Sequence, residues 1–167
     1  MPLRLEPLAL THLTHVMTWV NDRDVTQYFA NRQTDISESE ERAYLETMTT
    51  SSRDRVYSVF DDEVYVGQVS LNQIYWPAKN ARIFVVVRRE LQGRGFGTSA
   101  VERLIETAFG ELGLRKVWLI VRKDNRHAQA MYLRLGFDFE GVLRNEYCVN
   151  GVYYDMVRMA RLAPIVL

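Results

Sequence analysis

Three closely spaced glycines constrain this chain more than any other feature of its sequence. Gly93, Gly95 and Gly97 separate an apolar, β-branched run at 81–87 from a segment with helical periodicity at 98–112. The run predicts a buried strand, and the periodic apolar residues predict an amphipathic helix. Glycines permit a tight turn with exposed N–H groups, and the following helix directs its first N–H groups at the same loop. The stretch therefore predicts a strand–loop–helix phosphate site.

The amino-acid composition argues against some classes of function but does not identify one. The 167 residues carry 21 basic and 21 acidic side chains, so the formal net charge is zero. This balance gives no electrostatic reason to expect a nucleic acid or an anionic membrane as partner. The length predicts a single domain over 1–167, and no apolar run approaches the ~20 residues of a membrane span.

Cysteine usage and the N-terminus indicate the compartment. Cys148 is the single cysteine, which excludes an internal disulfide, and we expect no metal site. The first residues lack the basic-then-apolar pattern of a signal peptide. We therefore expect a cytoplasmic protein.

The apolar patterns predict an α/β (α+β) fold with a mixed sheet. Strands are expected at 3–7, 56–60, 64–74, 81–87, 116–121, 137–143, 146–149 and 152–159, and helices near 11–20, 24–30, 38–48, 98–112 and 126–135. The 116–121 strand is apolar throughout, so we expect it to be buried on both faces.

Several local signals predict how these elements begin and turn. Ser37 and Glu40 form a capping box at one helix start, while Thr11 and Asn125 can cap two others. The Asn150-Gly151 pair is typical of a two-residue hairpin turn.

The glycine loop can be compared with known phosphate-binding loops. A P-loop requires Lys followed by Ser or Thr after its glycines, and this chain has neither pair there. A dinucleotide loop beginning at Gly93 would need glycine where Thr98 stands. The pattern that fits is Q-x-x-G-x-G, carried by Gln92, Gly95 and Gly97, although an ordinary tight turn has the same composition.

A second motif lies downstream. Residues 125–137 fit N-x-x-A-x-x-x-Y-x-x-x-G-F, with Ala128 and Tyr132 four apart on one helix face. Taken alone, Tyr132 is equally interpreted as a core tyrosine at a helix–sheet contact. Taken with the loop, the motif resembles the GCN5-related N-acetyltransferase (GNAT) superfamily. Residues 139–159 resemble its spermidine and ribosomal-protein N-terminal acetyltransferase branch.

The resemblance implies a GNAT fold and an enzyme that uses acetyl-CoA. The fold would be a mostly antiparallel sheet of about seven strands with a splayed central parallel pair, flanked by about four helices. Acetyl would pass directly from acetyl-CoA to a primary amine, with Tyr132 as the general acid for the leaving thiolate. The donor-binding residues it implies are Val85, Val86, Val87, Gln92, Gly93, Arg94, Gly95, Phe96, Gly97, Thr98, Asn125, Ala128, Tyr132 and Arg134.

The general base and the acceptor stay open. Base candidates are Glu140, Glu146 and Asp155, or a water held by Ser70 or Gln73. The acceptor can be an amino sugar, a polyamine or a peptide N-terminus, and the resemblance also allows a homodimer. The acceptor-binding residues it implies are Trp19, Tyr28, Phe29, Asn72, Gln73, Trp76 and Glu146.

One observation bears on the acceptor class, and another bears on whether the protein is an enzyme. A polyamine site needs carboxylates, yet positions that are acidic in the spermidine branch carry neutral or basic residues here, Gln73 and Arg82 among them. The alternative to an enzyme is a catalytically silent acyl-CoA-binding regulatory domain, and the retention of Tyr132 argues against it.

Overall fold

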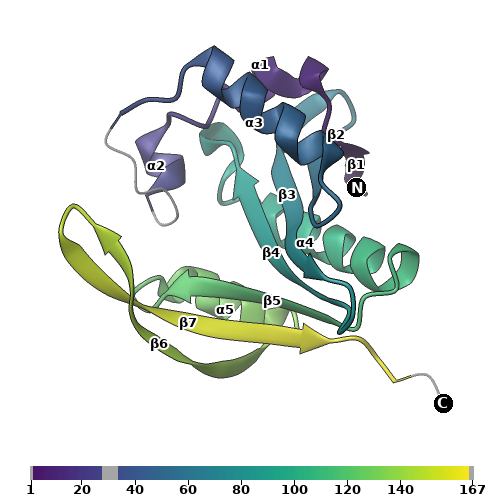
Figure 1. The fold of residues 1–167 in the computed structure, drawn as a ribbon, viewed down its shortest axis with the longest axis vertical. Coiled ribbons are helices and arrows are strands. Elements are labelled where there is room, and N and C mark those ends of the chain that lie inside the picture. Colours follow the sequence, from purple (N-terminus) through teal and green to yellow (C-terminus); the bar gives the residue numbers. More distant parts are fainter. Residues whose placement is uncertain (1, 28–33, 166–167) are drawn as a thin grey trace.

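A seven-stranded sheet organises the chain (Figure 1), whose computed structural model describes residues 2–27 and 34–165. The strands run in the order β1-β2-β3-β4-β5-β7-β6, and only β4 and β5 are parallel neighbours. This confirms the mixed, mostly antiparallel sheet with a central parallel pair. The strands are β1 (Arg4–Pro7), β2 (Arg55–Asp61), β3 (Val64–Tyr75), β4 (Asn80–Val87), β5 (Lys116–Arg122), β6 (Asp138–Val149) and β7 (Val152–Leu162).

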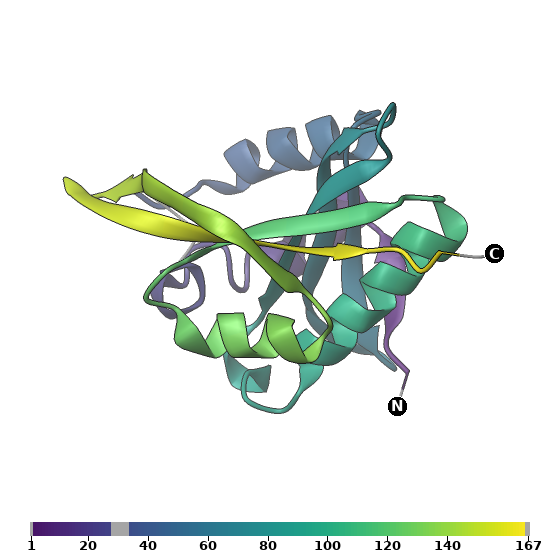
Figure 2. The same ribbon diagram turned by 90° about the horizontal axis from the view of Figure 1, so that it is seen from below.

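Helices cover both faces of this sheet. Figure 2 shows α3 on one side and α4 with α5 on the other. The helices are α1 (Leu13–Val16), α2 (Arg23–Thr26), α3 (Glu38–Thr50), α4 (Phe96–Glu106) and α5 (Arg126–Arg134), with short 3-10 turns at Leu10–His12 and Arg89–Leu91 and a π turn at Thr107–Glu111. Within the described ranges, no helix is long and apolar enough to cross a membrane.

Two apolar clusters hold the layers together. Val69 and Leu71 of β3 pack with Val101 and Leu104 of α4, and all four are fully buried. The second cluster lies under α3 and contains Leu45, Trp19, Phe60 and Tyr65. Burial of these side chains fixes α4 and α3 against opposite faces of the same strands.

Most predicted helix and hairpin signals are confirmed. The Glu40 N–H donates to Ser37 Oγ at 3.2 Å, and Ser37 N–H donates to Glu40 Oε2 at 2.8 Å. Asn125 Oδ1 accepts the Ala128 N–H at 3.2 Å, which caps α5. Asn150 and Gly151 have φ of 51° and 77°, as a two-residue turn between β6 and β7 requires.

The prediction for Thr11 is wrong. The first helical segment divides into a 3-10 turn and α1, and neither has a side-chain cap. The Ala9 N–H instead donates to Nδ1 of His12 at 3.3 Å. A histidine at the third helical position therefore accepts the N–H of the N-cap residue, the role that Glu or Gln has in a capping box.

Two strand predictions need correction. In β5 buried and half-buried residues alternate, so 116–121 is not buried on both faces. The reason is that β5 pairs with β4 over only its first three residues and then lines a cleft. The segments expected at 137–143 and 146–149 form one strand, β6, whose bulge contains Asn145 at φ 51°.

Candidate active site

The parallel strands β4 and β5 separate after three paired positions. Their ladder contains Asn80–Lys116, Ala81–Val117 and Arg82–Trp118, and it ends there. Beyond this point β4 stays with β3, and β5 stays with β7. The result is a fork in the centre of the sheet, occupied by a cavity of about 180 Å³ that we call the donor cleft. Its lining includes Arg82, Phe84, Val85, Ile120, Asn125, Ala128, Met131, Tyr132 and Tyr147.

The fork exposes one edge of β4. The Arg88 N–H donates to the Val66 carbonyl at 3.0 Å, and the β3–β4 register is continuous from that point. Because main-chain groups alternate sides along a strand, those of Val85 and Val87 are directed toward the fork. Val86 faces β3 instead, opposite Gln68. Two of the three valines predicted to bind the donor therefore lie on the edge that an added strand needs, although the Val87 carbonyl already accepts a hydrogen bond from Gln92.

The glycine loop lies beside the donor cleft, since a Cβ on Gly97 would stand 3.9 Å from Sδ of Met131, a residue that lines the cleft. Gly93 and Gly95 have φ of 74° and 84°, a conformation that favours glycine. Gly95 is the N-cap of α4 and provides no side-chain cap. The Ser99 N–H donates to the Gly95 carbonyl at 3.1 Å, so the amides at 96–98 have no partner within the helix. These amides and the helix dipole form the kind of site that binds phosphate.

Two side chains of the loop are placed differently. Gln92 Nε2 donates to the Val87 carbonyl at 2.9 Å, which ties the loop to the end of β4. Arg94 is exposed in front of it. The structure therefore gives Gln92 a positioning contact and leaves Arg94 able to reach an anion from solvent.

Helix α5 supplies the opposite wall of the donor cleft. Ala128 and Tyr132 both line it, as their spacing predicts, and Met131 between them was missed. Asn125 also lines it while its side-chain oxygen caps α5. Arg134 is exposed and does not line the cleft.

Tyr132 is buried in the wall of the donor cleft. Its side chain is 7% exposed, and its ring packs edge-on against Phe137 at a centroid distance of 5.4 Å. Burial raises the pKa of the hydroxyl, so the phenol keeps its proton at neutral pH. Among the described residues the hydroxyl has no hydrogen-bond partner, which argues against a purely structural core tyrosine.

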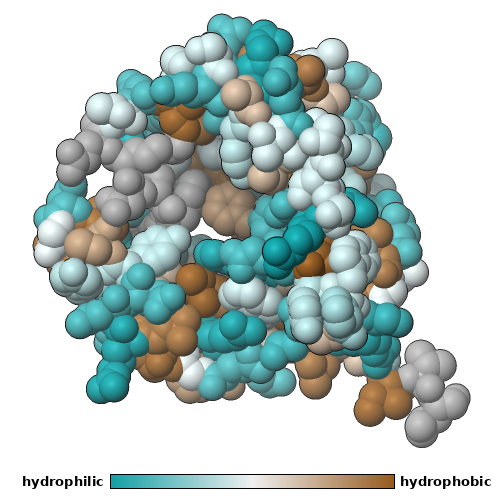
Figure 3. All heavy atoms as spheres, viewed as in Figure 1, coloured by the Kyte–Doolittle hydropathy of each residue, from teal (hydrophilic) through white to brown (hydrophobic). Residues whose placement is uncertain are grey.

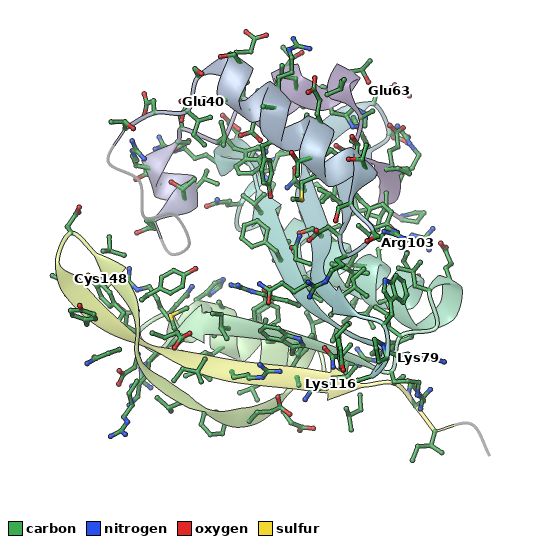
Figure 4. All side chains as sticks on the ribbon, viewed as in Figure 1. Glu40, Glu63, Lys79, Arg103, Lys116 and Cys148 are labelled. Carbon is green, nitrogen blue, oxygen red and sulfur yellow. The ribbon has the colours of Figure 1, made fainter. Side chains whose placement is uncertain are left out.

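A larger cavity of about 650 Å³, which we call the acceptor cavity, lies between α3 and the strands. Figure 3 shows this face hollowed, with apolar side chains in its depth. Figure 4 places Glu40 on α3 and Cys148 on the β6–β7 hairpin, on the two sides of the hollow. The cavity shares Arg82, Phe84 and Tyr147 with the donor cleft, so the two meet at these residues.

The acceptor residues predicted from the sequence separate into three groups. Trp19, Asn72 and Gln73 line the acceptor cavity. Trp76 is 39% exposed outside it and donates its ring N–H to the Ser52 carbonyl at 3.0 Å, and Glu146 is exposed on β6. Tyr28 and Phe29 lie outside the described residues.

The sequence reasoning missed the contribution of α3. Glu40, Glu41 and Tyr44 line the acceptor cavity from this helix. Glu40 was interpreted only as a capping residue, and its capping bond uses one carboxylate oxygen. The signal was the three-residue spacing of Glu41 and Tyr44, which places them on one face of a helix.

A hydrogen-bonded chain holds Asn72 and Gln73 in place. Asp54 accepts from the Ser51 hydroxyl at 2.6 Å, from Asn72 Nδ2 at 2.9 Å and from the Gln73 main chain. Burial opposes ionisation of this carboxyl, but the three hydrogen bonds hold the pKa of Asp54 below its usual value. Gln73 has φ of 51° at a bulge of β3, a strained conformation stabilised by this contact.

Two of the three carboxylates considered as general base, Glu140 and Asp155, are engaged elsewhere. Glu140 accepts from Lys116 Nζ at 2.9 Å and from Arg158 Nε at 3.1 Å, and these hydrogen bonds lower its pKa. Asp155 accepts the Asn145 N–H at 2.9 Å. Neither residue lines the two cavities, whereas Ser70 and Gln73 line the acceptor cavity.

The fold and the forked site define an acetyl-CoA-dependent N-acetyltransferase. The family model described as "Acetyltransferase (GNAT) domain" matches residues 2–138. The chain therefore belongs to the GNAT acetyltransferase family.

Its relatives include enzymes with different acceptors. The chain is 30% identical over 156 residues to spermidine N(1)-acetyltransferase of Escherichia coli K12, covering 93% of this chain and 83% of the relative. It is 29% identical over 108 residues to the ribosomal-protein-serine acetyltransferase of the same organism, covering 65% and 60%. A crystal structure of Vibrio cholerae spermidine N-acetyltransferase with CoA and spermine superposes with a TM-score of 0.90 at 28% identity, covering 96% of this chain and 95% of that one.

Proposed function

We propose that this enzyme transfers acetyl from acetyl-CoA to a primary amine of an aliphatic polyamine, with Tyr132 as general acid. The observation that carries the proposal is the junction of the donor cleft and the acceptor cavity at Arg82, Phe84 and Tyr147. A donor bound along β4 and an amine bound under α3 would meet at this junction.

The residues of the donor cleft fit acetyl-CoA. The main chains of Val85 and Val87 present a strand edge for an amide-containing arm such as pantetheine. The amides at 96–98 and the dipole of α4 suit its pyrophosphate. Gln92 joins the loop to the end of β4 through the Val87 carbonyl, so an extended donor could contact the strand edge and the loop amides in turn.

Tyr132 would supply the proton that the leaving thiolate takes. Tyr132 lines the donor cleft, and its hydroxyl has no hydrogen-bond partner in the described part of the chain. Like any phenol it carries a proton over the whole neutral pH range, and burial raises its pKa further. From the wall of the donor cleft it would act as a donor toward negative charge that develops beside it.

The acceptor cavity supports a cationic, partly apolar acceptor. Glu40 and Glu41 bring carboxylates to its wall, while Trp19 and Tyr44 bring aromatic faces. Carboxylates pair with ammonium groups, and aromatic faces attract cations. The sequence lacks carboxylates at the positions that are acidic in the spermidine branch, but the two glutamates of α3 supply carboxylates to the cavity instead. The spermidine acetyltransferases among the relatives point to the same acceptor class.

Thiol release with a panel of amines tests this function. The protein is incubated with acetyl-CoA and spermidine, spermine, an amino sugar or an N-terminal peptide, and the product is identified by mass. We expect the highest kcat/KM with a polyamine. Faster transfer to the peptide or the amino sugar, or no release above background with any polyamine, would contradict the proposal.

A pair of variants on α3 tests the binding of the polyamine charge. Glu40→Gln removes a charge from the cavity wall but keeps the capping box, because glutamine also serves in that position. We expect KM for spermidine to rise about tenfold, as for the loss of one partly exposed charged contact. Glu38→Gln on the same helix, outside the cavity, is the matched control and should leave KM unchanged.

A further inference from the structure

Arg82 occupies the point where the fork opens. It forms the last pair of the β4–β5 ladder with Trp118 and lines both cavities. Its guanidinium lies 5.9 Å from the centroid of the Trp118 ring. This contact holds a positive charge at the junction where donor and acceptor would meet.

The charge of Arg82 is not neutralised within the described part of the chain. Arg158 also contacts the Trp118 ring, at 4.0 Å, but it forms an ion pair at 3.1 Å with Glu140, a carboxylate that it shares with Lys116. Arg82 has no carboxylate within ion-pair distance there. Because no counter-ion offsets its charge, a half-buried arginine beside a reaction site exerts an electrostatic effect on any group that binds next to it.

Charge therefore differs between the two sides of the acceptor cavity. Glu40 and Glu41 stand on α3, and Arg82 stands on β4 next to β5. An ammonium group is favoured on the α3 side and disfavoured beside Arg82. An amine attacks only when it is unprotonated, so the side that disfavours ammonium is the side where attack would occur.

We propose that Arg82 is a specificity-determining residue that holds the reacting nitrogen unprotonated and directs any second ammonium of the acceptor toward α3. The direction of the second ammonium rests on the proposed polyamine function, whereas the effect on the reacting nitrogen holds for any primary amine. The ammonium first releases a proton to water. The amine then forms the N–C bond as the C–S bond breaks, sulfur takes the proton of Tyr132, and the second proton lost by nitrogen returns to Tyr132 through water.

The pH dependence of single-turnover transfer tests the effect on the reacting nitrogen. The reaction uses enzyme saturated with acetyl-CoA and with whichever primary amine the wild type acetylates fastest. In Arg82→Gln the apparent pKa of the bound amine should rise by about one unit, which lowers the rate at pH 7 about tenfold. Arg82→Lys keeps a positive charge and should keep the wild-type profile.

Two results would overturn this role. One is an unchanged profile in Arg82→Gln, and the other is the same shift in the glutamine and lysine variants, which would indicate a structural effect alone. The test uses whichever amine reacts fastest. If the enzyme prefers a peptide, the proposed polyamine function is contradicted, but the test of Arg82 stays valid.

A series of diamines tests the direction of the second ammonium. Short α,ω-diaminoalkanes hold their second charge near the reacting nitrogen, and therefore near Arg82, whereas long ones extend it toward α3. We expect wild type to prefer long diamines, and Arg82→Gln to reduce that preference about tenfold. Simple alkylamines of the same lengths are the control and should show no such change. An unaltered preference in Arg82→Gln would contradict the proposal.

Discussion

Gly67 on β3 lies so close to β4 that a Cβ on it would stand 2.0 Å from the Val86 carbonyl oxygen. Only glycine fits such an approach, because the obstructing atom belongs to the main chain. Val86 lies between Val85 and Val87, the residues whose main chains face the fork. The absence of a side chain on β3 therefore shapes the strand edge proposed to bind the donor.

Gly67→Ala should destabilise the protein and weaken donor binding together. The added methyl forces β3 and β4 apart, and overpacking of this kind costs about 1–3 kcal/mol in the free energy of unfolding. Urea unfolding and calorimetric titration with acetyl-CoA measure the two effects. Gly110→Ala is the control, because a Cβ there meets nothing within 4 Å and φ is not positive. An equal free energy of unfolding in Gly67→Ala and wild type would show that β4 can shift away from the added methyl without loss of stability.

Gly95→Val should abolish tight binding of acetyl-CoA. Gly95 has φ of +84°, which a β-branched residue rarely adopts, and its Cβ would enter the open space before the α4 amides. We expect the Kd to rise at least about tenfold, the loss of one charge-assisted contact or more. The variant Gly141→Val, on β6, is the control.

A truncated donor locates this effect. S-acetylpantetheine lacks the pyrophosphate, so Gly95→Val should use it as well as wild type does. Normal binding of acetyl-CoA by the variant, or equal losses with both donors, would place the pyrophosphate away from this loop.

The Asp54 network should make stability depend on acidic pH. Hydrogen bonds from Ser51, Asn72 and Gln73 outweigh burial and lower the pKa of Asp54, so its stabilisation is complete above the unfolded pKa of about 4. That stabilisation is lost as pH falls below about 4, through the folded pKa. Asp54→Asn should be less stable by about 1–2 kcal/mol at pH 7 and show a weaker loss toward pH 3.

Urea unfolding at several pH values measures this dependence. Asp138→Asn, an exposed carboxyl on β6, is the control and should keep the wild-type slope. An Asp54→Asn variant with the wild-type pH profile would show that the network does not stabilise the fold.

Local sequence signals predicted local structure well. The reciprocal bonds of Ser37 and Glu40, the Asn125 cap and the Asn150-Gly151 turn each depend on residues within four positions of one another. Such contacts form in the same way whatever the rest of the chain does. The motifs of the glycine loop and of α5 are also local, and they predicted the GNAT fold through their resemblance to that family.

Features that depend on distant contacts could not be predicted in this way. The close approach of Gly67 to Val86, and the left-handed Gln73 stabilised by Asp54, appear only when strands are paired. The apolar run at 116–121 gave no sign that its ladder with β4 would end at Trp118. The acidic wall of the acceptor cavity was missed because Glu41 lies on a helix far from the strands in sequence.

Tyr132→Phe tests the central claim most directly, with kcat and the acetyl-CoA Kd measured on the same protein. Removal of the hydroxyl should lower kcat by about 10²–10³-fold and leave the Kd within a few-fold of wild type, because only the proton donor is lost. Tyr153→Phe, on the exposed β7 hairpin, is the matched control and should keep both values. Wild-type kcat in Tyr132→Phe would contradict the account.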